Sequence, residues 1–178
     1  FDDLSMEEQF PIIAKALDIS KRVAYPDGKV LPIMDTWANQ RPSGGRIDEG
    51  SFLLPAAGIG RLAGGEGLDQ TQVYLYFQPK YGHNHYDGLN LNIFAQGQEL
   101  LPDLGYTHNS IYRYFSLSTM GHNTVVADSK NMSAGGLAKD GGQVRAYVPD
   151  GGMFQAMRAS YDGAYASTEQ YNREPWFV

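Results

Sequence analysis

Residues 81–128 read YGHNHYDGLNLNIFAQGQELLPDLGYTHNSIYRYFSLSTMGHNTVVAD, and this stretch decides the fold. Within it, residues 89–95 read LNLNIFA, in which leucine and isoleucine alternate with asparagine. Side chains of a β-strand alternate between the two faces of a sheet, so this run predicts a strand with an apolar core face and a polar face. We expect the polar face to be available for function.

Short apolar or alternating runs continue on both sides of this strand, most of them separated by glycine, Asp or Asn. Together they predict strands at residues 51–60, 72–77, 89–95, 99–101, 123–127, 143–148, 153–159 and 164–171. The 21 glycines, 12 tyrosines and 8 phenylalanines agree with strands joined by glycine turns. Many short strands at this spacing predict a mainly β chain, built as an antiparallel β-sandwich or barrel.

The N-terminal segment predicts a helix. Ser5, followed three residues later by Glu8, has the form of a capping box. Apolar side chains then recur at helical spacing, at Phe10, Ile13, Ala14 and Leu17. We therefore expect a helix within residues 5–24, with its start shifted or its axis kinked by Pro11. The YPDG sequence of residues 25–28 predicts a turn.

Length and composition narrow the class of protein. A chain of 178 residues with 42% hydrophobic residues predicts one main domain. The formal net charge of -6 argues against nucleic-acid binding, because no basic stripe neutralises phosphates. The sequence contains no run of about 18 apolar residues, so no membrane-spanning helix is predicted. The chain starts at Phe1 and ends in the apolar WFV, so we expect a fragment of a longer protein.

The four histidines, His83, His85, His108 and His122, all lie in residues 81–128, and the chain has no cysteine. On a strand, His83 and His85 would share one face. Asp103 follows His85 by 18 residues and precedes His122 by 19, which suits adjacent strands of a meander. Two histidines and a carboxylate are a good zinc set. The alternative is a group of hydrogen-bonding histidines without metal, which the HxH motif alone favours.

Tyrosine and arginine are concentrated before His122, at Tyr106, Tyr112, Arg113 and Tyr114. Tyrosine can act as acid or base, and arginine can clamp a carboxylate. The alternative role for such tyrosines is cross-strand packing. Asp87, followed by glycine, predicts a turn rather than a catalytic acid, and Trp37 suits a packing anchor as well as a sugar platform.

Three ordered blocks resemble the heparinase II/III-like polysaccharide lyases, which include heparinase and the oligoalginate lyases. They are GHNHYDGLNL at residues 82–91, GQELLPDLGY at 97–106 and RYFSLSTMGHNTVV at 113–126. The resemblance extends over residues 26–178, where PDGKVLP and MDTW resemble the end of the family's helical domain. Three blocks in order are far more specific than HxH alone, so we favour the metal over the metal-free alternative.

The resemblance implies a fold and a reaction. The family joins an (α/α) toroid to an antiparallel β-sandwich, so residues 1–45 would end the toroid and its linker, and residues 46–178 would form an incomplete β-sandwich. Such lyases cleave uronic-acid-containing polysaccharides by β-elimination. A base removes the C5 proton, the 4-O bond breaks and an unsaturated sugar remains, which requires the sugar carboxylate to be neutralised. Periplasmic or secreted localisation is implied too.

The resemblance also assigns residues to roles. The implied ligands of a structural zinc ion are His85, Asp103 and His122. His83 matches an active-site histidine, Tyr114 is the tyrosine we take as catalytic, and the implied substrate-binding residues are Asn84, Tyr112 and Arg113. The family's principal catalytic tyrosine and its carboxylate-neutralising Asn or His lie upstream of Phe1, so we expect this chain to bind zinc without efficient turnover.

Several alternatives stay open at this point. Alginate-type and heparin-type substrates are both compatible with the blocks, and the full-length protein is open to homo-oligomer formation. A second function is a non-catalytic carbohydrate-binding β-sandwich, which would have no need of His83 beside a zinc site. A third is a cupin-like metal enzyme, which would require a further ligand to complete an open metal site.

Overall fold

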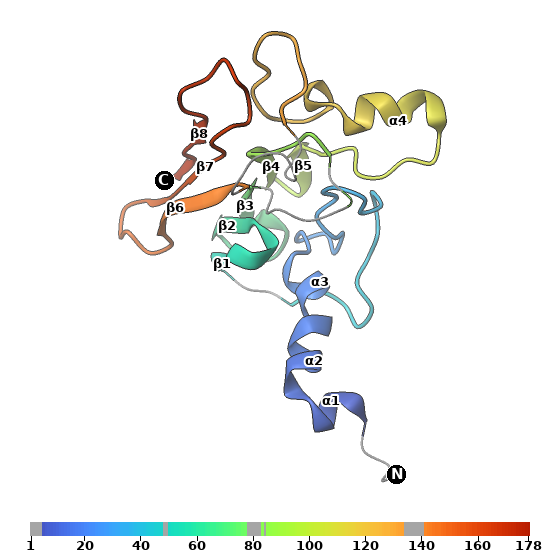
Figure 1. The fold of residues 1–178 in the computed structure, drawn as a ribbon. Coiled ribbons are helices and arrows are strands. Elements are labelled where there is room, and N and C mark those ends of the chain that lie inside the picture. Colours follow the sequence, from blue (N-terminus) through green and yellow to red (C-terminus); the bar gives the residue numbers. More distant parts are fainter. Residues whose placement is uncertain (1–4, 48–49, 78–82, 84, 134–140) are drawn as a thin grey trace.

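The computed structural model describes residues 5–47, 50–77, 83, 85–133 and 141–178, and these form two antiparallel sheets (Figure 1). The first sheet has the strand order β1 (Phe52–Leu54), β2 (Ile59–Gly64), β3 (Thr71–Tyr76), β4 (Asn90–Ala95) and β5 (Gln98–Leu101). The second has the order β6 (Gln143–Val148), β7 (Gln155–Ser160) and β8 (Asn172–Arg173), and β9 (Trp176–Phe177) also pairs with β7. The mainly β, antiparallel prediction is confirmed.

One face of the first sheet packs against the second sheet. Leu62, Val73 and Leu75 belong to the same buried cluster as Met157 and Ala159 of β7. Glycine in β2 allows the close approach, since a Cβ at residue 60 would lie 2.7 Å from the sulfur of Met157. A larger side chain there would require the Met157 side chain to move.

The opposite face of the first sheet is covered by residues 23–34. Tyr25 from this segment stacks on Phe94 of β4 at 5.5 Å and meets Tyr74 of β3 edge to face at 5.6 Å. Asn90 and Asn92 lie on this covered face and are both 0% exposed. The polar face of β4 is therefore buried, because an apolar segment from earlier in the chain packs over it.

Arg61 is a fully buried cation in β2. Its guanidinium lies 4.3 Å from the centre of the Phe52 ring and donates to the carbonyl oxygens of Gly50 (2.8 Å) and Arg22 (3.0 Å) and to the hydroxyl of Tyr74 (3.0 Å). These contacts join the helical N-terminal segment to the first sheet. The carbonyl dipoles and the ring face help to solvate this buried charge.

The N-terminal segment forms three short helices, α1 (Met6–Gln9), α2 (Pro11–Leu17) and α3 (Ile19–Arg22), which extend away from the sheets (Figure 1). The capping box is confirmed: Ser5 and Glu8 exchange side-chain to backbone bonds of 2.7 and 3.3 Å. Pro11 begins a new helix, as expected for a residue without an N–H. The turn at residues 25–28 is confirmed by a 2.8 Å bond from Gly28 N to Tyr25 O.

Two predicted strands are absent, and side chains satisfy part of the backbone of the first of them. Residues 123–127 and 164–171 contain no strand. The carbonyl of Val125 instead accepts from the hydroxyls of Tyr165 (3.2 Å) and Tyr171 (2.6 Å), and the Asn123 N–H donates to the side chain of Asn90 at 2.8 Å. These tertiary contacts replace a strand ladder.

The stretch before His122, for which no helix or strand was predicted, contains a helix, α4 (Ser110–Leu117), which Asn109 caps through a 3.0 Å bond from the N–H of Ile111. Three 3₁₀ turns complete the regular structure described: η1 (Pro55–Ala57), η2 (Gly67–Asp69) and η3 (Thr119–Gly121). None of the helices in the described ranges has the length and apolar character needed to cross a membrane.

Replacement of Arg61 tests the packing of the N-terminal segment on the sheet. We expect Arg61→Ala to lower the free energy of unfolding by about 3 kcal/mol, because several charge-assisted hydrogen bonds and the ring contact disappear together. Urea unfolding measures this change. The control is Arg158→Ala, whose 3.7 Å ion pair with Glu174 is exposed and should contribute less than about 1 kcal/mol. Equal losses in the two variants would contradict the structural role of Arg61.

Candidate metal centre and adjoining pocket

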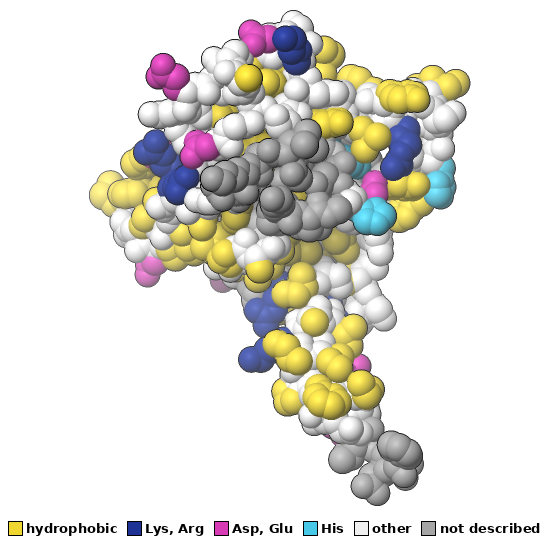
Figure 2. Space-filling model, viewed as in Figure 1, with side chains coloured by type: hydrophobic (Ala, Val, Ile, Leu, Met, Phe, Trp, Pro, Cys, Tyr) yellow, Lys and Arg dark blue, Asp and Glu magenta, His cyan; other side chains and the backbone are white. Residues whose placement is uncertain are grey.

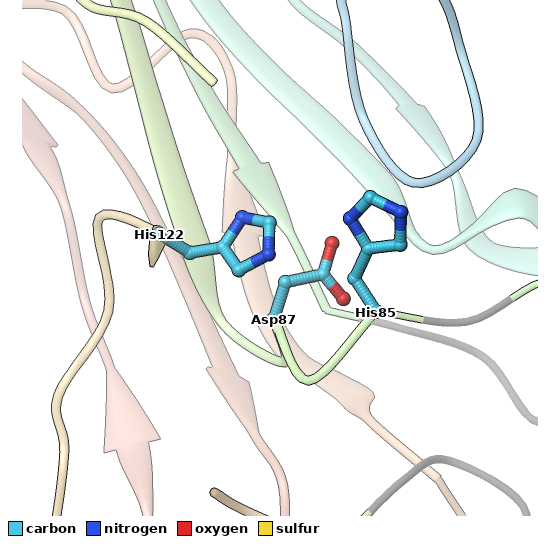
Figure 3. A group of neighbouring side chains, drawn as sticks. All are labelled: His85, Asp87 and His122. Atoms are coloured by element: carbon cyan, nitrogen blue, oxygen red, sulfur yellow. The ribbon is translucent and has the colours of Figure 1, made fainter. Parts of the chain in front are cut away.

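Two imidazoles and a carboxylate meet in the interior, at His85, Asp87 and His122 (Figure 3). One ligand atom from each lies within 4.8 Å of the others, and the residues are 1%, 0% and 8% exposed. His85 and Asp87 belong to the connection between β3 and β4, and His122 follows η3. Figure 3 shows the carboxylate of Asp87 directed into the space between the two rings. Histidine nitrogen and carboxylate oxygen are ligands that suit zinc.

Asp103 lies on the other side of His122. Its Oδ2 is 2.9 Å from Nδ1 of His122 and accepts a 2.6 Å bond from the Asn90 amide, while its Oδ1 accepts from the Gly105 N–H at 2.8 Å. The other ring nitrogen of His122, Nε2, is buried and has no hydrogen-bond partner among the described residues. The buried group of His85, Asp87 and His122 therefore fits a metal ion, which Nε2 of His122 could bind.

The structure therefore brings the sequence-predicted set of His85, Asp103 and His122 into one region, and it adds Asp87. The turn expected at Asp87 is present, since its carbonyl accepts from Asn90 N at 3.0 Å. Sequence reasoning missed that the side chain of this turn residue points inward to the two imidazoles. The HxHxD spacing of residues 83–87 was the available signal.

Burial and mutual charge set the protonation of this group. Burial raises the pKa of Asp87 to about 7, with the Asp103 carboxylate acting in the same direction. Burial lowers the pKa of His85, and a charge on His122 would lower it further. Burial also opposes the charging of His122, but its hydrogen bond to Asp103 prevails and the net pKa is raised. Asp87 therefore retains a proton near neutrality unless a cation replaces it.

Asp35 connects the buried group to the surface. Its Oδ1 lies 3.3 Å from Nε2 of His85 and its Oδ2 lies 2.9 Å from Nδ1 of His83. Burial opposes ionisation of Asp35, but the bonds from the two histidines and the charge of Arg113 leave its pKa below the usual range. One carboxylate thus holds an exposed histidine and a buried histidine.

The condition under which His83 and His85 would share one face, a strand through both residues, is not met. Neither residue is in a strand, and His83 has a positive φ of 58°. The side chain of His83 is 85% exposed, whereas that of His85 is 1% exposed. The two imidazoles contact different oxygens of Asp35, so a face-sharing argument does not apply.

A pocket of about 530 Å³ opens beside Asp35, and its lining is Asp35, Trp37, His83, Tyr106, His108 and Arg113. Figure 2 shows histidine, acidic and basic side chains gathered among hydrophobic ones on one flank of this face. A second pocket, of about 660 Å³, lies against α2, α3 and residues 30–43 and shares Asp35 and His83 with the first. His83 therefore lines both pockets.

The remaining predicted residues are distributed around this pocket. Arg113 lines it, and its guanidinium lies 3.8 Å from Asp35 and 4.7 Å from the centre of the Tyr106 ring. Tyr112 and Tyr114 are on α4 and are 65% and 84% exposed, outside the pocket lining. Asn84 lies outside the described residues.

Comparison with known proteins identifies the family. The model of the heparinase II/III-like C-terminal region matches residues 46–173. The chain belongs to this family. No curated protein matches the sequence.

Solved heparinases share the fold of this family member. A heparinase III structure superposes with a TM-score of 0.75 at 17% identity, covering 98% of this chain and 33% of the other. A second heparinase III gives a TM-score of 0.77 at 18% identity, covering 97% and 31%. The heparan sulfate lyase HepC of Pedobacter heparinus gives 0.70 at 17%, covering 94% and 30%. The chain thus spans about a third of the length of these heparinases.

The burial of Asp87 predicts an unusual pH dependence when a chelator is present. Its folded pKa of about 7 lies above its ordinary value of 3.8, so the folded chain retains a proton that the unfolded chain loses in this window. The free energy of unfolding should therefore fall as the pH rises from about 4 to 7, with Asp87 contributing up to about 4 kcal/mol. Urea unfolding at several pH values should show a weaker fall in Asp87→Asn. Parallel curves would contradict the assignment.

Proposed function

We propose that the protein is part of a polysaccharide lyase that cleaves uronic-acid-containing polysaccharide by β-elimination. The observation that carries this proposal is the family match together with His83, an exposed imidazole fixed by Asp35 where two pockets meet. β-Elimination needs a positioned base or acid next to a site that accepts an anionic sugar. The pocket offers the imidazole of His83 and the guanidinium of Arg113.

His83 would take part in the proton transfers. With Nδ1–H donating to Asp35, its Nε2 has a lone pair for a proton from C5 of the uronate or, once protonated, a proton for the leaving oxygen. Arg113 would offset the negative charge that the sugar carboxylate gains as C5 loses its proton. Tyr114 remains our proposed second acid or base, and Tyr106 is an alternative because it lines the pocket.

A zinc ion would be held by His85 and His122 with a carboxylate. Asp103 is the carboxylate that the family resemblance implies, whereas Asp87 is the one whose ligand atom lies within 4.8 Å of both histidines. Zinc would supply a fixed positive charge that ties these loops together. Because the centre is buried and Asp35 connects His85 to His83, we assign the ion a structural role.

The substrate and setting follow as parts of the same proposal. An acidic polysaccharide of either the heparan or the alginate type would meet Arg113, and secretion or a periplasmic location would bring the enzyme to such polymers. Residues 1–45 would end a helical toroid. This is supported by the apolar side chains that α1, α2 and the residue between them expose, at Met6, Phe10, Ile12 and Leu17.

Zinc analysis of the purified chain tests the metal centre. We expect about one zinc ion per chain, lost in His85→Ala and His122→Ala, because each would remove a nitrogen ligand. Asp103→Asn and Asp87→Asn, compared side by side, identify the carboxylate ligand. The control is His108→Ala, which should retain zinc because its exposed ring lies outside the buried group. A folded wild-type chain without zinc would contradict the proposal.

Lyase activity of the full-length protein tests the reaction. Ultraviolet absorbance of the new C4–C5 double bond should increase with heparan or alginate substrate, and the 178-residue chain alone should turn over poorly. His83→Ala should lower kcat by a factor of about 100 or more, since a positioned proton donor or acceptor is lost. Its zinc content should equal that of the wild type. Full activity in His83→Ala would rule out the assigned role.

A further inference from the structure

Three aromatic rings form a cluster at the pocket beside Asp35 and belong to neither hydrophobic core. The Trp37 ring lies 4.8 Å from that of Tyr106 and 4.6 Å from that of His108, and the last two are 5.0 Å apart. All three pairs meet edge to face, at 69°, 66° and 86°. Trp37 is 45% exposed, a large fraction for a ring held by two aromatic neighbours. Such an arrangement keeps ring surface in contact with solvent.

The backbone fixes this cluster before any ligand arrives. The N–H of Tyr106 donates to the carbonyl of Thr36 at 3.0 Å, so the loops that carry Trp37 and Tyr106 are joined. Gly105, at a φ of 58°, brings its backbone against that of Thr36 and donates to Asp103. A preformed ring surface loses little conformational entropy when it binds a ligand.

Charge next to the rings defines the chemistry of the ligand. The guanidinium of Arg113 lies over the Tyr106 ring at 4.7 Å, and His83 stands at the same pocket. The Arg113 guanidinium makes one 3.4 Å bond to the Thr107 carbonyl and a long 3.8 Å contact with Asp35. An arginine held this loosely can donate to a carboxylate or sulfate oxygen. Asp35 disfavours a second anion at its own end, which directs the anionic group toward Arg113.

We propose that this pocket is a subsite for one uronic-acid unit of an oligosaccharide. The sugar ring lies with its C–H face on Trp37, and its carboxylate or sulfate accepts from Arg113. Tyr106 and His108 hold the tryptophan in place, and the pocket volume of about 530 Å³ is in the range of small-ligand sites. This subsite deepens the proposed function and rests on it for the substrate class.

The two tryptophans of the chain make the test direct, because Trp37 is in the subsite and Trp176 stacks on Phe154 in the second sheet. Trp176→Phe leaves Trp37 as the single indole reporter, and Trp37→Phe leaves Trp176. Each chain is titrated with a heparan sulfate hexasaccharide, a mannuronate hexasaccharide and neutral cellohexaose.

We expect a saturable fluorescence change at Trp37 with an acidic hexasaccharide, little change with cellohexaose, and none at Trp176. Arg113→Gln in the Trp176→Phe background should weaken binding about tenfold or more. Its matched control is Arg158→Gln, an exposed arginine paired with Glu174, which should bind normally. No response of Trp37 to either acidic sugar, or equal affinity in Arg113→Gln, would overturn the subsite.

Lyase assays of the full-length protein separate this proposal from the proposed function. If Trp37→Ala forms unsaturated product with the KM of the wild type, the subsite fails and the lyase assignment stands. If Trp37 binds acidic sugar while the full-length protein forms no unsaturated product, the lyase assignment fails and the subsite stands. Equal zinc content in Trp37→Ala and in the wild type would show that the variant folds. Trp37→Tyr, which keeps an aromatic ring, should have most of the affinity for acidic hexasaccharide that Trp37→Ala loses.

Discussion

The buried carboxylate of Asp103 is the constraint on which the rest of the site depends. Its side chain is fully buried. It accepts hydrogen bonds from the Asn90 amide and the Gly105 N–H, and it is hydrogen-bonded to the ring of His122. A buried carboxylate without such partners would be strongly destabilising, so these groups must meet for the chain to fold. Strand β4, the end of β5 and the loop after η3 are joined at this one side chain.

Two carboxylates, Asp103 and Asp35, contact three of the histidines. Asp103 orients His122 inside the protein, and Asp35 holds both His85 and His83 at the boundary with solvent. His83, His85, His122 and both carboxylates therefore lie outside the strands, on connecting segments, which is where binding and catalytic residues are commonly found. The backbone from Asp103 through Gly105 to Tyr106 connects this group to the aromatic cluster, since Gly105 donates to Asp103 and Tyr106 donates to Thr36.

Both faces of the first sheet are covered, which limits where its residues reach solvent. Residues 23–34 occupy the face that carries Asn90 and Asn92, and the second sheet occupies the other. The asparagines therefore act inside the protein: Asn90 links Asp103 to the backbone of Asn123. Open surface is left beside the sheet, where His83 and Trp37 line the pocket.

The sequence by itself determined the alternation of β4, the capping box at Ser5, the turn at residues 25–28 and the histidines and carboxylate that meet near His122, since these depend on local spacing or on residue type. Only the tertiary structure decided which face of β4 is covered, that the Val125 carbonyl accepts from two tyrosine hydroxyls instead of joining a strand ladder, and that Asp87 points inward. The physical reason is that burial and hydrogen-bond pairing depend on segments far apart in the chain. Asp35 and His83, 48 residues apart, are the clearest example.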